Sequence, residues 1–497
     1  MQRVDVLRAE WPLHAVAATR AIEREATAAL PAHTLMRRAG VAAARLALAL
    51  TPHAPRWWIA AGPGNNGGDG LEAALQLQRA GKQVRVSLLG DAARLPTDAA
   101  AALARAQAAG VPITAGLDEA GDAGEPAIDA LLGLGTSRAP AGAIAPTIAR
   151  LNARRGIVLA IDLPSGLDGA TGRLFGAAAV RATHTLSLLT LKPGLYTGAG
   201  RDHAGEAWLD TLDVDLDANL ADALLSGGAH CLRRAPRRHA QHKGSFGDVF
   251  VVGGAPGMLG AALLASRAAH AAGAGRVYVS LLDESGAAPT HDALRPELMF
   301  RARAWQRPPA ELAAATVLAG CGGGDAVRTA LPALMSNAAR LVLDADALNA
   351  IAADSGLQTL LVARAARRRA TVLTPHPLEA ARLLCCPVAE VQADRLEAAA
   401  RLVRQCNCVV LLKGSGSVIA SSRSRPNINP TGNAALATAG TGDVLAGWIA
   451  GLWAQAGDEA DAHAVAVQAA FRHGLAAEGV LAPLRASELI ERMHALG

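Results

Sequence analysis

The sequence predicts an α/β protein made of two domains, each with a parallel sheet covered by helices. Three observations lead to this prediction. The chain has 497 residues, which is long for a single hydrophobic core. Hydrophobic residues make up 51% and charged residues 18%, as in folded globular proteins and unlike disordered ones. In both halves, short apolar runs alternate with alanine-rich segments of helical periodicity, which is typical of parallel strands joined by helices.

The apolar runs predict the strands in order. Those of the first half are RWWIAA (56–61), QVRVSLL (83–89), PAIDALL (126–132), IVLAID (157–162) and HTLSLLTL (184–191). Those of the second half are DVFVVGG (248–254), RVYVSLL (276–282), ATVLAG (315–320), RLVLD (340–344), ATVLTP (370–375) and CVVLLKG (408–414). Residues 213–240 between the two groups are polar and weakly patterned, so we expect the domain boundary there. The predicted domains are residues 1–220 and 230–497.

Charge and composition argue against several classes of partner. A net charge of +5 is small for this length, so we expect no nucleic-acid partner. The six cysteines form no CxxC pair or metal-ligand spacing, and residues 1–16 mix charge into every apolar run. Both features indicate a reduced, cytoplasmic protein without a secretory signal. Residues 433–457 hold Asp443 as their only charge, and their glycines and threonines predict a buried helix rather than a membrane span.

A glycine-rich segment follows the first predicted strand. Residues 62–70 read GPGNNGGDG, whereas a tight turn needs only one or two glycines. Between a strand and a helix of an open α/β sheet, such a turn lets backbone N–H groups approach an anion. Asn65, Asn66 and Asp69 add oxygens that suit a ribose hydroxyl or a hard monovalent cation. We therefore expect a ligand loop here in preference to a structural turn.

Two more predicted strands of the first half carry aspartates near their ends. Asp129 is followed by a second glycine loop, Gly133 to Gly135, and Asp162 is followed by Ser165. A carboxylate at the end of an apolar strand is costly without a partner, so each either faces a ligand or caps a helix. Three such loops in one sheet favour a shared site.

The densest pattern of the second half is AGTGDVLAG, residues 439–447. Its first N–H groups can hold a phosphoryl group at the start of a helix, while Asp443 takes a proton from an attacking hydroxyl. The alternative is an aspartate that the helix dipole favours. Lys413 and the Gly-Ser-Gly turn after it suit nucleotide phosphates. Two other strands lead into Asp344, Asp346, Asn349 and His376, and we expect His376 to contact substrate, although a lone histidine is more often a surface residue.

Six motifs of the first half occur together in one family. They are RAIE (20–23), LMRRAG (35–40), AGPGNNGGDGLEAA (61–74), DALLGLG (129–135), DLPSGLDGATG (162–172) and LKPGL (191–195). With them, residues 10–215 resemble the NAD(P)H-hydrate epimerase domain of the YjeF N-terminal type. The resemblance implies a Rossmann-like fold, Asp162 as the acid/base residue and a potassium ion held by Asn66, Asp129 and Ser165. The implied substrate residues are Asn65, Asn66, Gly67, Gly68, Asp69, Gly133, Leu134, Gly135, Thr136 and Asp162, with the loop backbone continuing to Arg138.

The second half carries its own set of motifs. HKGSFGDVFVVGGAPGMLGAALLASRAA (242–269), VLDADALNA (342–350), LTPHPLEAARLL (373–384), LLKGSGSVI (411–419), NPTGNAALATAGTGDVLAG (429–447), HGLAAEG (473–479) and ASELI (486–490) resemble the ADP/ATP-dependent NAD(P)H-hydrate dehydratases. The resemblance implies a ribokinase-like fold. It implies nucleotide binding by Lys413, Gly414, Ser415, Gly416, Ser417 and Gly442, and hydrate binding by Ala261, Gly324, His376 and Asp443, with Asp443 as the base. Cys321, Leu378 and Ala439 depart from the usual residues of these loops.

Together the two resemblances imply a bifunctional repair enzyme. Its first domain would interconvert the R and S forms of hydrated NADH and NADPH. Its second domain would dehydrate the S form at the expense of ADP, with magnesium accompanying the nucleotide. A ribokinase-type small-molecule kinase would also carry the AGTGD motif, but it would lack the first domain. A noncatalytic scaffold would need neither Asp162 nor Asp443. The sequence leaves open the choice between ADP and ATP and whether the protein forms a homo-oligomer.

Overall fold

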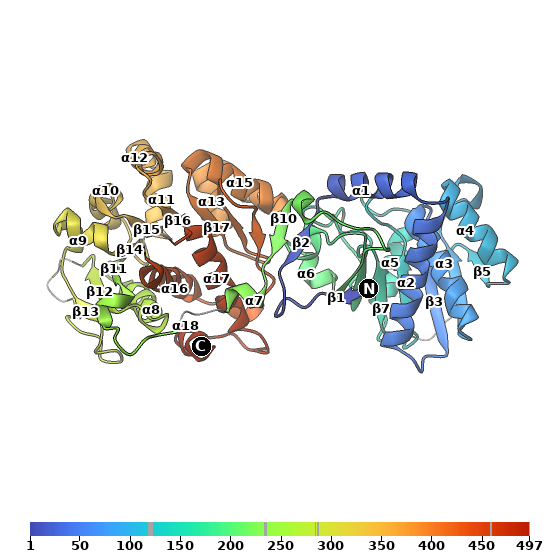
Figure 1. The fold of residues 1–497 in the computed structure, drawn as a ribbon, viewed down its shortest axis with the longest axis horizontal. Coiled ribbons are helices and arrows are strands. Elements are labelled where there is room, and N and C mark those ends of the chain that lie inside the picture. Colours follow the sequence, from blue (N-terminus) through green and yellow to red (C-terminus); the bar gives the residue numbers. More distant parts are fainter. Residues whose placement is uncertain (118–122, 233–235, 284, 286–287, 458–459, 497) are drawn as a thin grey trace. The chain divides into compact units, whose positions relative to one another are not determined.

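The structure is a computed structural model that describes residues 1–117, 123–232, 236–283, 285, 288–457 and 460–496. The chain divides into two compact units (Figure 1). The first contains Met1–Asp5 and Trp11–Leu224, and the second contains Val6–Glu10 and Leu225–Gly497. The division after residue 224 falls within the segment 213–240 that the sequence suggests as a boundary, of which residues 233–235 lie outside the described part.

The first unit is built on a mostly parallel sheet. Its strand order is β1-β9-β8-β7-β6-β3-β4-β5, and only the pairing of β1 with β9 is antiparallel among the described pairs. From β3, the chain first adds β4 and β5 on one side and then β6 to β9 on the other. The strands of this sheet are β1 (Gln2–Arg3), β3 (Arg56–Ala61), β4 (Gln83–Leu88), β5 (Ile113–Ala115), β6 (Ala127–Ala130), β7 (Val158–Ile161), β8 (His184–Leu188) and β9 (Glu206–Asp210). The short strand β2 (Trp11–Leu13) does not belong to it.

Apolar cores cover both faces of this sheet. Trp57 and Ile59 of β3 point into one core, while Trp58 and Ala60 point into the other. This alternation is why the strand sequences are apolar throughout instead of alternating with polar residues. The helices of the unit, several of which flank β3 in Figure 1, are α1 (Val16–Ala29), α2 (Thr34–Leu50), α3 (Asn65–Arg79), α4 (Thr97–Ala108), α5 (Ile144–Asn152) and α6 (Gly200–His203).

The second unit repeats this plan with another topology. Its strand order is β13-β12-β11-β14-β15-β16-β17-β18-β19, parallel from β13 to β17 and antiparallel from β17 to β19. Its strands are β11 (Asp248–Gly253), β12 (Arg276–Leu281), β13 (Met299–Phe300), β14 (Thr316–Ala319), β15 (Arg340–Leu343), β16 (Thr371–Leu373), β17 (Val409–Leu412), β18 (Val418–Ala420) and β19 (Asn427–Ile428). A short strand, β10 (Ala223–Leu225), lies at the division.

Helices again cover the sheet of the second unit on both faces. Val249 and Val251 of β11 enter one core and Phe250 and Val252 enter the other. The helices are α7 (Gly228–Cys231), α8 (Leu259–Ala271), α9 (Pro309–Ala314), α10 (Val327–Asn337), α11 (Asp346–Ala352), α12 (Ser355–Ala366), α13 (Pro377–Leu384), α14 (Val388–Ala393), α15 (Arg395–Cys406), α16 (Thr441–Ala456), α17 (Ala462–Leu475) and α18 (Ala486–Ala495).

The apolar window 433–457 forms the buried helix α16. A Cβ atom on Gly447 would lie 2.0 Å from the carbonyl oxygen of Ala265 in α8, so this glycine is required for the close packing of the two helices. None of the helices in the described residues is long and apolar enough to cross a membrane.

One sequence expectation needs correcting at α3. The asparagine-glycine segment was expected to form a turn before the helix, but α3 already begins at Asn65. Cβ atoms on Gly67, Gly68 and Gly70 would approach Gly62, Met36 and Ala130 to between 2.0 and 2.6 Å. The glycines therefore let the helix pack against its neighbours, and this packing outweighs their poor intrinsic helix propensity.

Candidate active sites

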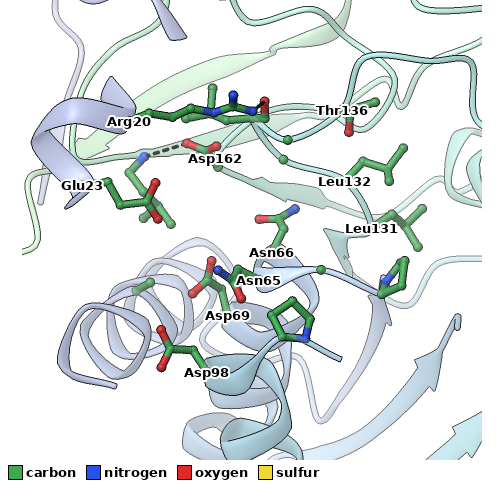
Figure 2. A pocket seen from close by; sticks show the side chains of 18 of the residues that line it. Arg20, Glu23, Asn65, Asn66, Asp69, Asp98, Leu131, Leu132, Thr136 and Asp162 are labelled. Atoms are coloured by element: carbon green, nitrogen blue, oxygen red, sulfur yellow. Dashed lines mark hydrogen bonds between the residues drawn. The ribbon is translucent and has the colours of Figure 1, made fainter. Parts of the chain in front are cut away.

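The candidate site of the first unit lies at the topological switch point of the sheet, where the strand order reverses. β3 and β6 are neighbours, but the chain leaves them toward opposite edges of the sheet, and ligands of open α/β sheets bind in the crevice at such a point. The residues after these two strands line a cavity of about 1020 Å³ (Figure 2). Of the predicted substrate residues, the cavity wall contains Asn65, Asn66, Asp69, Gly133, Leu134, Gly135, Thr136 and Asp162. Gly67 and Gly68 are instead covered by helix packing.

Asp162 is held in a strained and charged setting. It follows β7 with a φ of 67°, a left-handed conformation that non-glycine residues adopt at a cost and that is common at functional sites. Its Oδ1 accepts a hydrogen bond of 2.5 Å from Nζ of Lys192, which has no solvent exposure (dashed in Figure 2). The ammonium of Lys192 also donates to the carbonyl oxygen of Leu188 at 2.7 Å and to Ser187 Oγ at 3.2 Å. Lys192 therefore holds the Asp162 carboxylate in position.

The three predicted potassium ligands lie around the same strand ends. Oδ1 of Asp129 accepts from Ser165 Oγ at 2.6 Å, and Oδ2 accepts from the Ser165 backbone N–H at 2.8 Å. Both side chains are fully buried, and burial raises the pKa of Asp129 to about 6. The side-chain oxygen and nitrogen of Asn66 are buried and have no hydrogen-bond partner among the described residues. A Cβ atom on Gly133 would lie 3.3 Å from Asn66 Cβ and 3.5 Å from Asp162 Oδ2, so these residues adjoin.

These observations fit a hard monovalent cation. An amide oxygen without a partner and a buried carboxylate without a neighbouring ammonium both gain from a cation with oxygen ligands.

In the second unit, a lysine-carboxylate pair again lies beyond the strands. Asp344 follows β15 and its Oδ1 accepts hydrogen bonds from Lys413 Nζ at 2.7 Å and Thr374 Oγ1 at 2.8 Å. Asp443, in the first turn of α16, lies beside it, and the ligand atoms of Cys321, Asp344 and Asp443 are all within 4.8 Å of one another. Burial and then repulsion from Asp344 raise the pKa of Asp443 to about 6.

The predicted nucleotide loop joins the antiparallel strands β17 and β18. Gly414 and Gly416 have φ values of 139° and 61°, which favour glycine, and Ser417 Oγ donates to the Gly414 carbonyl oxygen at 3.1 Å. The buried Arg395 donates from Nη2 to the carbonyl oxygens of Leu412 and Lys413 at 3.1 and 3.0 Å, which holds the start of the loop. A Cβ atom on Gly442 would lie 3.4 Å from Lys413 Nζ, so the loop and the N-terminus of α16 meet at this ammonium.

The predicted hydrate-binding residues of this unit come from three further elements. Ala261 lies in the first turn of α8, beside the loop after β14. In this loop the N–H of Gly324 donates to Asp346 Oδ2 at 2.8 Å. His376 caps α13, because its Nδ1 accepts from the N–H groups of Leu378 and Glu379. The cap thus occupies Nδ1 of His376. Only its Nε2, which lies 3.2 Å from Glu379 Oε1, is left to contact a substrate.

Sequence reasoning missed the partners of the predicted residues. Lys192 occurs in the motif LKPGL, and Asp344 in VLDADALNA, but neither was assigned a role. Cys321 was noted only as a departure from a usual proline, although its side chain hydrogen-bonds Asp443. A lysine directly after an apolar strand is the one signal that could have indicated Lys192, because such a cation needs a buried partner.

Two α/β units, each with a lysine-carboxylate pair beyond the carboxyl ends of its parallel strands, define a two-domain enzyme with one ligand site per domain. Residues 32–194 match the family described as YjeF-related protein N-terminus, and residues 249–491 match the family described as NAD(P)H-hydrate dehydratase. The chain belongs to the bifunctional NAD(P)H-hydrate repair enzymes.

Curated relatives match over nearly the whole chain. The bifunctional NAD(P)H-hydrate repair enzyme of Escherichia coli is 37% identical over 92% of this chain and 87% of its own length. That of Coxiella burnetii is also 37% identical, over 90% of each chain. A solved ADP/ATP-dependent NAD(P)H-hydrate dehydratase from Bacillus subtilis, co-crystallised with ATP and Mg²⁺, is 29% identical, covers 54% of this chain and 95% of its own, and has a TM-score of 0.44.

Proposed function

We propose that the first domain interconverts the R and S forms of hydrated NADH and NADPH, and that the second dehydrates the S form with ADP, giving AMP and phosphate. The observation that carries this proposal is the presence, in each domain, of a carboxylate at a strand or helix end with a lysine beside it, fully buried in the first domain and partly buried in the second. Asp162 faces a cavity of about 1020 Å³, and Asp443 lies at the N-terminus of α16.

In the epimerase domain, Asp162 would exchange the proton of the C6 hydroxyl. A carboxylate held by Lys192 can accept this proton and return it, and its position after β7 places it at the wall of the cavity. Potassium would be held by Asn66, Asp129 and Ser165, where it would supply a positive charge beside the substrate hydroxyls.

In the dehydratase domain, Asp443 would take the proton of the C6 hydroxyl as this oxygen attacks the terminal phosphate of ADP. The N–H groups at the start of α16 and Lys413 would stabilise the phosphoryl oxygens. Phosphate then leaves C6, and loss of a proton from C5 restores the dihydronicotinamide ring. Magnesium would accompany the nucleotide and neutralise its charge, and the oxygens of Asp344 and Asp443 are ligands of the type that it prefers.

The kinase alternative is less favoured. It accounts for the second domain alone, whereas the family matches extend over both domains and name no small-molecule kinase for the whole chain. A cytoplasmic location, a possible homo-oligomer and the preference for ADP over ATP stay predictions from the sequence.

A recovery assay tests the proposed function. Mixed R and S hydrated NADH is supplied with ADP or ATP, and the absorbance of the restored NADH is followed. We expect complete recovery by the intact chain with ADP. Asp162→Asn should stop after the S fraction is consumed, and Asp443→Asn should epimerise without restoring NADH. If neither ADP nor ATP supports recovery of NADH, the kinase alternative would be favoured instead.

A separate assay tests the potassium site. Replacing potassium by tetramethylammonium should slow epimerisation, and potassium should raise the thermal unfolding temperature of the wild-type protein but not of Asn66→Ala. An equal thermal effect of potassium on both proteins would contradict the assignment of Asn66 as a ligand.

A further inference from the structure

Asp69 is a second carboxyl group that faces the epimerase cavity. It lies in the second turn of α3, is half-buried and lines the same cavity as Asp162. Figure 2 shows its carboxyl group pointing from α3 into the space that Asp162 borders from the other side. Unlike Asp162, its side chain has no hydrogen bond and no ion pair with any described residue, so no side chain is paired directly with its carboxyl group.

The charged groups around Asp69 are mostly acidic. Asp162 lies across the cavity, Glu23 belongs to α1, Glu72 to α3 and Asp98 to α4. Lys192 and Arg105 are engaged by Asp162 and Glu72, and His33 is engaged by Asp98. The α2 side chains at the cavity are the apolar Leu35, Met36 and Ala39. The cavity wall also contains Arg138, and Arg20 of α1, whose Nη2 donates to the carbonyl oxygen of Leu134 at 3.0 Å. Burial, and then repulsion by Asp162 and Glu23, therefore raise the pKa of Asp69 well above its ordinary value.

Two carboxyl groups in different surroundings within one cavity are suited to acid-base chemistry. Inverting C6 by opening the ring needs both a proton acceptor and a proton donor, because one proton must leave the C6 hydroxyl while another reaches the ring nitrogen. Asp162 accepts a hydrogen bond from the Lys192 ammonium, whereas Asp69 has no direct partner and lies among acidic groups that favour its neutral form.

We propose, resting on the epimerase function above, that Asp69 is the proton donor that complements Asp162. Asp162 accepts the hydroxyl proton, the C6–O bond becomes a carbonyl, the C6–N1 bond breaks, and its electron pair on N1 takes the proton of Asp69. After rotation about the bond to the freed carbonyl carbon, N1 attacks the other face. Asp69 recovers its proton from N1 and Asp162 returns its proton to oxygen, so that no net reactant is consumed.

The test compares Asp69→Asn with Asp69→Glu and Asp98→Asn in the full-length protein. Asparagine keeps the size and hydrogen-bonding capacity of a neutral carboxyl group but transfers no proton. We expect the kcat of epimerisation to fall about 100-fold or more in Asp69→Asn, the scale of general-acid catalysis, with KM changed less than about threefold. Asp69→Glu should restore part of kcat, and Asp98→Asn, which removes an equal charge from the cavity edge, should lower it far less.

The pH profile separates proton transfer from a structural role. The wild-type kcat should decline at high pH as Asp69 loses its proton, and this decline should be absent from the residual activity of Asp69→Asn. A higher KM with unchanged kcat, or a wild-type alkaline decline retained in Asp69→Asn, would overturn the proposal and leave Asp69 as a binding residue. Those outcomes differ from failure of the proposed function, in which the wild-type protein itself would not interconvert the two forms. Thermal unfolding of each variant establishes that its first domain is folded.

Discussion

At the residue scale, Lys192 is the clearest example of a side chain whose role depends on its partner. Its ammonium has no solvent exposure and reaches Asp162, 30 residues earlier in the chain. Removing one member of a buried ion pair leaves the other charge uncompensated, at a cost of about 3–5 kcal/mol. Lys192→Met should therefore destabilise the first domain and abolish most epimerisation, while dehydration of the pure S form continues.

Lys82→Met is the matched control for this change. Lys82 lies in the same domain, and its Nζ donates only to the carbonyl oxygen of Pro52 at 2.7 Å. Urea unfolding followed in both variants should show a loss of stability in Lys192→Met alone. Equal stability of the two variants would mean that the pair with Asp162 does not hold the site together.

The second residue-scale prediction concerns Cys321 and the pH dependence of dehydration. Asp443 must be ionised to accept a proton, and its pKa is raised to about 6, so kcat/KM should fall as the pH decreases through about 6. The hydrogen bond from the Cys321 thiol favours the ionised form. Cys321→Ala removes it, and the midpoint of the acid limb should move to higher pH.

Cys406→Ala provides the comparison, because Cys406 is a buried thiol of the same domain that packs in the other core. Its acid limb should coincide with that of the wild-type protein. If Cys321→Ala also leaves the midpoint in place, the thiol does not act on Asp443.

The sequence indicated some of the candidate site residues but not their partners. Asp162, Asp129 and Asn66 could be selected because each lies at or after the end of an apolar strand in a distinctive motif. The structure places them at the same edge of the sheet, at or just beyond the carboxyl ends of β3, β6 and β7. The partners Lys192 and Asp344 could not be selected, since their contacts depend on segments that meet only in the folded sheet.

At the element scale, α3 depends on glycines for its position. A Cβ atom on Gly70 would lie 2.5 Å from Ala130 Cβ in β6. Gly70→Ala should therefore push the helix from the sheet and lower the free energy of unfolding by about 1–3 kcal/mol, the usual cost of overpacking. Gly64→Ala is the control, because a Cβ atom at Gly64 has no neighbour within 4 Å and its φ is −112°. A Gly70→Ala protein as stable as Gly64→Ala would show that the helix has room to shift.

The central strands of both sheets were predictable because each is an apolar run that is buried on both faces of its sheet. The start of α3 was misplaced because glycine has a low helix propensity, and the close approach of α2, α4 and β6 that overrides it is a tertiary effect. The sequence prediction also missed the strands β1, β2, β5, β9, β10, β13, β18 and β19, of which all but β9 have only two or three residues.

At the scale of the whole molecule, each unit has its own core clusters and its own candidate site. The division was predictable from the polar segment after residue 213, but the inclusion of Val6–Glu10 in the second unit was not, because five residues carry no periodic pattern. Separate sites imply that the S form made by the first domain must reach the second as a free intermediate or by transfer between domains.

We propose that Asp162 and Asp443 serve two distinct reactions, and a mixture of the two single variants tests this assignment. Asp162→Asn and Asp443→Asn are combined in equal amounts with mixed R and S hydrated NADH and ADP, and restored NADH is measured against each variant alone. We expect complete recovery by the mixture, because one protein supplies epimerisation and the other supplies dehydration. Recovery that stops at the S fraction in the mixture, as it does with Asp162→Asn alone, would contradict it.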